Sequence, residues 1–212
     1  KVDAITRLGA TVVKWSMDDW WRVIQDHGAP GMAGRFIHPA ADPDIIAANA
    51  TVGVEILEDL PDVDTVLVPW GGGGLSCGIA ALLRHKGSGA RVFGCEADTG
   101  TPLTASLKAG SAQQVERKPS FIDGIGGKGV LPEIFPLAQE LLAGSIVSSV
   151  AEVVAALRLM VERNHVVAEG AGAASVAAAL GGKAGGKKVV CVISGGNIDL
   201  AVLAKILIGE TP

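Results

Sequence analysis

Short apolar runs alternate with longer amphipathic stretches along most of the chain. The short runs are continuous and bounded by glycine or charge, as is typical of parallel strands covered on both faces. Strands are predicted at residues 11–15, 35–38, 65–69, 91–95, 145–148 and 188–193. Helices are predicted at residues 17–27, 44–57, 75–85, 133–142, 150–164, 171–180 and 199–208. This alternation predicts βαβ units, and therefore an α/β fold with a doubly wound, mostly parallel sheet.

The helix predicted at residues 150–164 has the clearest start signal. Ser149 and Glu152 form an S-x-x-E capping box, in which each side chain accepts a backbone N–H of the other residue. Apolar residues then recur at helical spacing. The stretch 100–120 is polar instead and contains turn residues such as Pro102 and Gly110. It predicts an irregular excursion between sheet elements.

Composition and charge narrow the class of protein. The chain has 212 residues, 49% of them apolar, which suits one sizeable domain or one domain and a piece of a second. The net charge of −4 gives no electrostatic reason to expect nucleic acid or an anionic membrane as a partner. No apolar run approaches the roughly 20 residues that a membrane span requires.

Seven side chains carry a thiol or an imidazole: Cys77, Cys95, Cys191, His27, His38, His85 and His165. Neither set shows the pairing of metal ligands, and an odd number of cysteines argues against a disulfide framework. Cys95 and Cys191 lie in apolar runs and are predicted to be buried thiols in a reducing compartment. We therefore expect a cytoplasmic protein.

The glycine-rich turn from Gly71 to Gly74 stands between the predicted strand 65–69 and the predicted helix 75–85. Glycine permits positive φ and leaves no Cβ to obstruct an approaching group. Successive amide N–H groups can therefore converge on an anion at the start of the helix, where the helix dipole favours negative charge. The alternative is a linker or a plain turn, but a linker would not be flanked by a buried strand and an apolar helix. We therefore predict anion binding here.

The spacing excludes two kinds of nucleotide site. A Walker loop requires a lysine after its glycines, and none follows here. A dinucleotide fingerprint requires glycines at i, i+2 and i+5, but Ser76 and Cys77 occupy the last position in the two possible registers. The formal match Gly124-x-Gly126-x-x-Gly129 lacks a good strand before it and a good helix after it. A single phosphate monoester held by backbone amides fits best.

Several motifs, in the right order, resemble the fold-type II pyridoxal-phosphate enzymes, specifically the serine/threonine dehydratase and serine racemase branch. They are H-P-A-A-D-P-D-I-I-A from residue 38, V-P-W-G-G-G-G-L from residue 68, D-G-I from residue 123, E-G-A-G-A from residue 169 and S-G-G-N from residue 194. Ala48-Asn49-Ala50 departs from the family's Gly-Gln-Gly. The resemblance covers nearly the whole chain. It implies the tryptophan synthase β-like fold, with residues 1–38 as a remnant of the small domain and residues 39–212 as the large cofactor-binding domain.

The resemblance also implies eight contacts to pyridoxal 5'-phosphate: Gly71, Gly72, Gly73, Gly74, Leu75, Glu169, Ser194 and Gly195. The glycine turn and the amide of Leu75 would cradle the phosphate. Ser194 would hydrogen-bond the pyridine nitrogen, and a neutral hydroxyl there favours prompt β-elimination because it makes the ring a weaker electron sink. Glu169 would lie near the pocket. The alternatives are a helix cap or turn serine at Ser194, and at Glu169 a carboxylate favoured by the helix dipole.

A metal site is not expected. Some relatives bind a divalent cation through a Glu after the strand that corresponds to residues 91–95 and an Asp six residues later. Glu96 fits the first position and is a weak candidate, but Pro102 occupies the second.

The family's Schiff-base lysine stands in an S-x-K-x-R context, which no lysine of this chain has. The chain starts at Lys1 without an initiator Met, and its first residues resemble the middle of a domain. We therefore expect the C-terminal part of a longer enzyme, with the catalytic lysine in a preceding segment, and we expect the fragment alone to be inactive.

The activity that the resemblance implies is a lyase that converts L-threonine, L-serine or a related β-hydroxy amino acid to a 2-oxo acid and ammonia. An amino-acid racemase or a β-replacement synthase of the same fold is the nearest alternative. A non-catalytic phosphate-binding α/β module and a dinucleotide-dependent enzyme are the other two. The intact enzyme is expected to be a homo-oligomer, a dimer.

Overall fold

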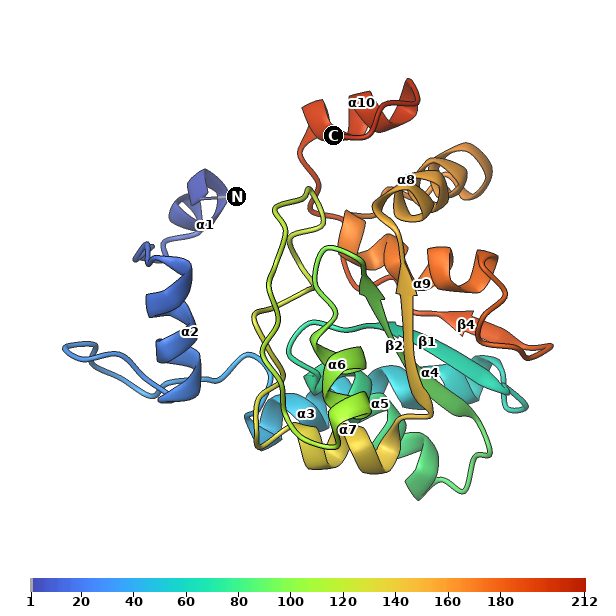
Figure 1. Cartoon of the computed structure of the whole chain (residues 1–212), viewed down its shortest axis with the longest axis horizontal. Coiled ribbons are helices and arrows are strands. Elements are labelled where there is room, and N and C mark those ends of the chain that lie inside the picture. The colour runs from blue at the N-terminus through green and yellow to red at the C-terminus, as the bar shows by residue number, and fades with distance from the viewer. Residues whose placement is uncertain (1) are drawn as a thin grey trace. The chain divides into compact units, whose positions relative to one another are not determined.

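A computed structural model describes residues 2–212 of the chain (Figure 1). These residues divide into two compact units, of which one ends at His38 and the other is Pro39–Pro212. Their assignment to a small-domain remnant and a large domain stays a prediction. Every helix within residues 2–212 is too short or too polar to cross a bilayer.

The larger unit is built on a parallel sheet with the strand order β3-β2-β1-β4. The strands are β1 (Thr65–Pro69), β2 (Arg91–Ala97), β3 (Gly144–Ser148) and β4 (Val189–Cys191). Each residue of β1 is buried, because β1 lies between two neighbouring strands and is covered on both faces. This explains why the run is continuously apolar, and it confirms the predicted α/β fold with a parallel sheet.

The order of the strands contains one change of direction. From β1 the chain adds β2 and then β3 on one side, and it returns to the other side of β1 to form β4. In open α/β sheets, ligands bind outside the carboxyl ends of the strands at such a switch point. The switch point here lies between β1 and β4.

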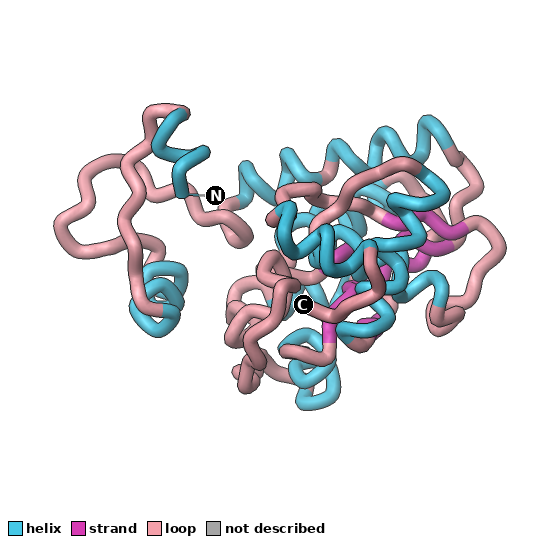
Figure 2. Tube along the Cα trace, turned by 90° about the horizontal axis from the view of Figure 1, so that it is seen from above, coloured by secondary structure: helices cyan, strands magenta, loops and turns pink. Residues whose placement is uncertain are grey.

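Helices cover both faces of the sheet (Figure 2). The helices of this unit are α3 (Pro43–Asn49), α4 (Thr51–Asp59), α5 (Gly74–His85), α6 (Pro102–Ala109), α7 (Phe135–Leu141), α8 (Val150–Leu159), the π-helix η1 (Met160–Asn164), α9 (Gly170–Leu180) and α10 (Leu200–Leu207). The alanine-rich α9 packs against all four strands, with α8 beside it, and α5 packs against β1 and β2 from the opposite face, with α3, α4 and α7 around it. The doubly wound arrangement is therefore confirmed.

Each predicted helix is present, with changes at two of them. The capping box of Ser149 and Glu152 starts α8 as predicted. The predicted helix 150–164 continues into η1 and stops at His165, which has a φ of +57°. The predicted helix 44–57 is two helices that meet at Ala50. Close packing accounts for the position of α3, because a Cβ at Gly78 of α5 would overlap the carbonyl oxygen of Ile46.

The excursion predicted at residues 100–120 contains a helix that the sequence pattern did not reveal, α6. Pro102, interpreted as a turn residue, is instead at the first position of this helix, where its missing N–H costs nothing. Gly110, with a φ of +69°, ends the helix in the left-handed conformation. The prediction of irregular structure there was wrong for residues 102–109.

The smaller unit contains α1 (Val2–Arg7) and α2 (Met17–Gln25). Ser16 caps α2, and Trp21 and Ile24 are its buried residues. The strands predicted at residues 11–15 and 35–38 were wrong, because neither run pairs with a strand anywhere in residues 2–212. A β-strand requires such a partner for its backbone N–H and C=O groups.

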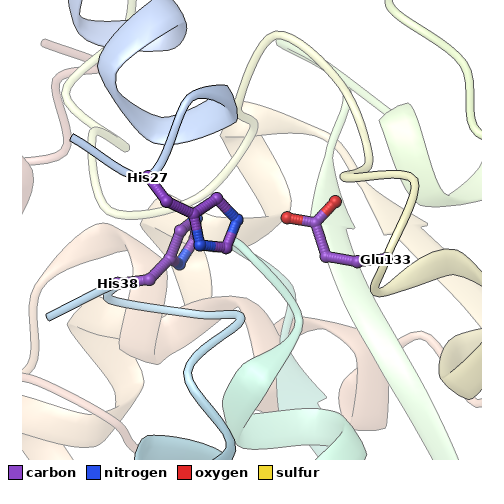
Figure 3. A group of neighbouring side chains, drawn as sticks. All are labelled: His27, His38 and Glu133. Carbon is purple, nitrogen blue, oxygen red and sulfur yellow. The ribbon is translucent and has the colours of Figure 1, made fainter. Parts of the chain in front are cut away.

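Two histidines that the sequence spacing did not connect lie together in the smaller unit. The ring centroids of His27 and His38 are 4.7 Å apart, and Phe36 packs beside both rings. Figure 3 shows these two imidazoles; Glu133, also drawn there, belongs to the larger unit and precedes α7. His27 has a φ of +53°, in the left-handed region, just after the C-cap of α2. The spacing along the sequence gave no sign that these two rings are neighbours, and the expectation that the histidines are not metal ligands stays a prediction.

Candidate active site

The glycine turn and the S-G-G-N segment both lie at the switch point of the sheet. Trp70 and then Gly71 follow the carboxyl end of β1. Ser194 follows β4, after Val192 has extended the pairing by donating its N–H to the carbonyl of Leu67 at 2.9 Å. Neighbouring parallel strands therefore deliver both segments to the same edge of the sheet, which is where an α/β protein binds its ligand.

The turn presents main-chain donors that no acceptor among the described residues uses. Helix α5 begins at Gly74, and its N-cap is Gly73, which has a φ of +93° and no side chain to cap the helix. Within residues 2–212, the amides of Gly71 to Leu75 have no hydrogen-bond acceptor. Free N–H groups at the start of a helix of this length attract an anion through both their hydrogen bonds and the helix dipole.

Ala40 leaves no space for a side chain at two positions of the turn. A Cβ on Gly72 would overlap the methyl group of Ala40, and a Cβ on Gly74 would lie 2.6 Å from the Ala40 carbonyl oxygen. Only glycine fits at these positions. The H-P motif and the glycine motif are therefore in direct contact.

The remaining motifs are connected to the turn by close contacts. A Cβ on Gly71 would lie 3.2 Å from the carbonyl oxygen of Gly124, and one on Gly124 would lie 3.3 Å from Glu169 Oε1. A Cβ on Gly195 would lie 2.5 Å from the same Oε1, and the Glu169 N–H donates to the Gly195 carbonyl at 3.0 Å. Segments that are more than 100 residues apart in the sequence thus form one continuous surface.

Glu169 is the N-cap residue of α9, but its side chain forms no capping hydrogen bond. The half-buried carboxylate instead lies against the main chain of Gly124 and Gly195. Ser194 is exposed and does not cap the following helix, because that cap is Asp199, whose carboxylate accepts the N–H of Ala201 at 2.8 Å. Contacts of these residues to the cofactor stay predictions.

Two further polar groups lie at the ends of the turn. Ser76 Oγ and Trp70 Nε1 are both buried and have no hydrogen-bond partner within the described residues. Sequence reasoning used Ser76 only to exclude a dinucleotide fingerprint and did not consider Trp70. Spacing gives no signal for either residue, since the burial that makes them unusual follows from the packing of β1, β2 and α5.

Glu96 caps a helix. Its fully buried carboxylate accepts the N–H of Leu103 at 2.7 Å and the N–H and hydroxyl of Thr104 at 2.9 and 2.6 Å. Burial raises the pKa of this carboxyl, while the hydrogen bonds from Thr104 and Leu103 oppose the rise. Among residues 2–212, Glu96 belongs to no cluster of three metal-ligating side chains. The strand-end position that suggested a metal ligand places this carboxylate at the start of α6, and the expectation of no metal site stays a prediction.

The cysteines are free thiols in the described part of the chain, and Cys77 and Cys95 are buried whereas Cys191 is half-buried. Cys77 lies in the first turn of α5, where a helix dipole would favour a thiolate. Burial dominates there and raises the pKa of Cys77 to about 12. Burial likewise raises the pKa of Cys95 to about 12. Neither thiol is a reactive nucleophile.

Comparison with known proteins agrees with this arrangement. The family model described as pyridoxal-phosphate dependent enzyme matches residues 1–195. The chain belongs to this family. It is 41% identical to an L-threonine ammonia-lyase from Thermotoga maritima over 173 residues. These residues make up 81% of this chain and 43% of that protein.

Two solved structures of the family have closely similar folds. The processed form of threonine deaminase isoform 2 from Solanum lycopersicum has a TM-score of 0.83 and 27% identity, over 98% of this chain and 63% of that one. Serine racemase from Dictyostelium discoideum has a TM-score of 0.78 and 28% identity, over 93% of this chain and 65% of that one. The chain thus spans about half to two thirds of the length of these relatives.

Proposed function

We propose that this chain is the cofactor-binding part of a pyridoxal 5'-phosphate dependent lyase. The lyase would convert L-threonine, L-serine or a related β-hydroxy amino acid to a 2-oxo acid and ammonia. The observation that supports the proposal best is the row of unused amides from Gly71 to Leu75 at the switch point of the sheet. The relatives named as threonine ammonia-lyase and threonine deaminase support the choice of reaction.

The turn suits a phosphate monoester. Its donors are neutral main-chain groups, and the close contacts with Ala40 exclude side chains from the cradle. Gly71 to Leu75 would hold the phosphate and so fix one end of the cofactor. The bound cofactor would supply an electron sink that stabilises negative charge at the substrate's α-carbon.

Ser194 and Glu169 would act at the other end of the cofactor. The Ser194 hydroxyl, exposed at the carboxyl end of β4, would hydrogen-bond the pyridine nitrogen. A hydroxyl holds a proton on this nitrogen less strongly than a carboxylate does, which favours departure of the β-hydroxyl. The Glu169 side chain, against Gly124 and Gly195, would lie near the ring.

Turnover tests the reaction. The full-length product of the gene, incubated with pyridoxal 5'-phosphate, should release equal amounts of ammonia and 2-oxo acid from L-threonine or L-serine. Ser194→Ala should lower kcat, with the phosphate affinity unchanged. Absence of 2-oxo acid, although the cofactor is bound, would reject the lyase.

A racemase is the second candidate, because the serine racemase fold matches almost as well as that of threonine deaminase. Chiral separation of the amino acid after incubation distinguishes the two reactions. Accumulation of D-serine without 2-oxo acid would favour the racemase. A homodimer and a cytoplasmic location stay predictions, to be tested by gel filtration with light scattering and by cell fractionation.

A further inference from the structure

Trp70 occupies the position between β1 and the glycine turn, and its side chain is fully buried. Its backbone N–H donates to the carbonyl of Cys95 at 2.8 Å, so the residue still pairs with β2. The large ring is therefore anchored to the sheet at the point where the chain leaves it.

The ring lies directly beneath the turn. A Cβ built on Gly73 would be 2.5 Å from Trp70 Cη2 and 3.1 Å from Cζ2. At the other edge of the ring, Cε3 would be 3.4 Å from a Cβ on Gly94 of β2. The six-membered ring thus bridges a strand of the sheet and the residue that caps α5.

Two further residues lie close to the turn. Ile134 Cγ2 would lie 2.7 Å from a Cβ on Gly73, and the Ala40 carbonyl oxygen would lie 2.6 Å from one on Gly74. Gly73 has a φ of +93°, a conformation that a flexible glycine does not hold without outside contacts. Trp70 and Ile134 at Gly73, and Ala40 at Gly74, therefore lie close around the turn.

We propose that Trp70 is a positioning residue, which holds the glycine turn in its phosphate-binding shape; the proposal rests on the function proposed above. Its role comes from the reach of the bicyclic ring, since the buried indole N–H has no acceptor among residues 2–212 and so adds no stabilising hydrogen bond. Without the ring, the turn would have to be ordered by the ligand, which weakens binding.

The test compares Trp70→Phe with a matched control. Phenylalanine keeps a ring next to Gly94 but does not reach Gly73. Trp21→Phe is the control, because Trp21 is also buried, at 7% exposure, and also has an N–H without a partner in the described chain, but it lies in the smaller unit. Both variants should lower the Tm by a few degrees.

Binding of two probes separates positioning from general stability. The affinities of the 212-residue chain for pyridoxal 5'-phosphate and for pyridoxal, which lacks the phosphate, are measured by equilibrium dialysis. Trp70→Phe should weaken binding of pyridoxal 5'-phosphate about tenfold and leave pyridoxal unchanged, whereas Trp21→Phe should change neither. If Trp70→Phe does not fold, Ile134→Ala, which removes the other side chain close to Gly73, should show the same selective loss.

The outcomes of the proposal and of the proposed function are distinguishable. Suppose the wild-type chain binds pyridoxal 5'-phosphate more tightly than pyridoxal, and Trp70→Phe shows the same ratio of the two affinities. This would overturn the role of Trp70 and leave the proposed function standing. An equal loss of affinity for both probes would also overturn it, since the effect would then be general. A wild-type chain without preference for the phosphate would overturn both.

Discussion

Two glycine-rich loops lie at opposite ends of strands β1 and β4. The glycine turn, Gly71 to Gly74, follows the carboxyl end of β1, and the second loop, residues 181–188, leads into the amino end of β4. Both contain glycines with positive φ. They differ in what their amides do: the N–H groups of Lys187 and Lys188 donate to the Asp64 carboxylate at 2.8 and 3.0 Å, whereas those of Gly71 to Leu75 have no acceptor within residues 2–212.

In the second loop, main-chain amides of the same kind already bind an anion. Its anion is a carboxylate of the protein itself, and the hydrogen bonds from the Lys187 and Lys188 amides lower the pKa of Asp64. Glycine content does not distinguish the two loops. The two loops differ in their amides, since those of the glycine turn are unused and stand at the start of a helix. The glycine turn is therefore the loop that suits an external anion.

The largest effect is expected from Gly73→Ala. The methyl group would be held at a φ of +93° and would press on Trp70 and Ile134. Backbone strain and overpacking together should lower the free energy of unfolding by roughly 2–4 kcal/mol. Urea denaturation measures this loss, and binding of pyridoxal 5'-phosphate should disappear.

Gly186→Ala in the second loop is the matched control. Its φ is +107°, and a Cβ there would overlap the Asp64 carboxylate and lie 2.7 Å from Thr65 Oγ1. A similar loss of stability is expected, with binding of pyridoxal 5'-phosphate retained. Loss of binding in both variants would show that binding follows stability rather than the turn.

A smaller effect is expected at α8, where side chains of the protein satisfy the start of the helix. The N–H of Glu152 donates to Ser149 Oγ at 3.2 Å, and the N–H of Ser149 donates to Glu152 Oε2 at 2.6 Å. Ser149→Ala should lower the free energy of unfolding by about 1 kcal/mol and leave cofactor binding unchanged. If this variant is as stable as the wild type, the capping hydrogen bonds of α8 add little stability, and the comparison with the uncapped start of α5 fails.

The smallest effect should be the pH dependence that Asp64 contributes, because this carboxylate is only half-buried. Its folded-state pKa lies below the ordinary value of 3.8. The stabilisation is therefore present well above pH 3.8 and is lost as the pH falls through the lower folded-state value. Asp64→Asn should weaken the decline in stability at acidic pH. Denaturation curves at several pH values test this, and parallel profiles for the two proteins would contradict it.

Local signals were sufficient to predict the elements of the sheet and the start of α8. Short apolar runs identified all four strands, most clearly at β1, which is fully buried and lies between α9 and α5. The same signal was misleading at residues 11–15 and 35–38, since an apolar run becomes a strand only where a partner is available.

Helix α6 and the support of the turn could not be predicted from local sequence. The carboxylate that caps α6 belongs to Glu96, on the preceding strand, so no cap stands next to the helix in the sequence. The role of Trp70 depends on Gly73 and Gly94 being adjacent in space. The family motifs indicated which segments matter, but their contacts through Gly124, Glu169 and Gly195 emerge only in the fold.

Amide NMR tests the central claim most directly. A 15N-labelled sample of the chain is titrated with inorganic phosphate and with pyridoxal 5'-phosphate, and the backbone amide signals of both glycine-rich loops are followed. We predict saturable shifts for Gly71 to Leu75 and none for Lys187 and Lys188, whose N–H groups already bind Asp64. Unchanged signals in the glycine turn, or equal shifts in both loops, would contradict the account.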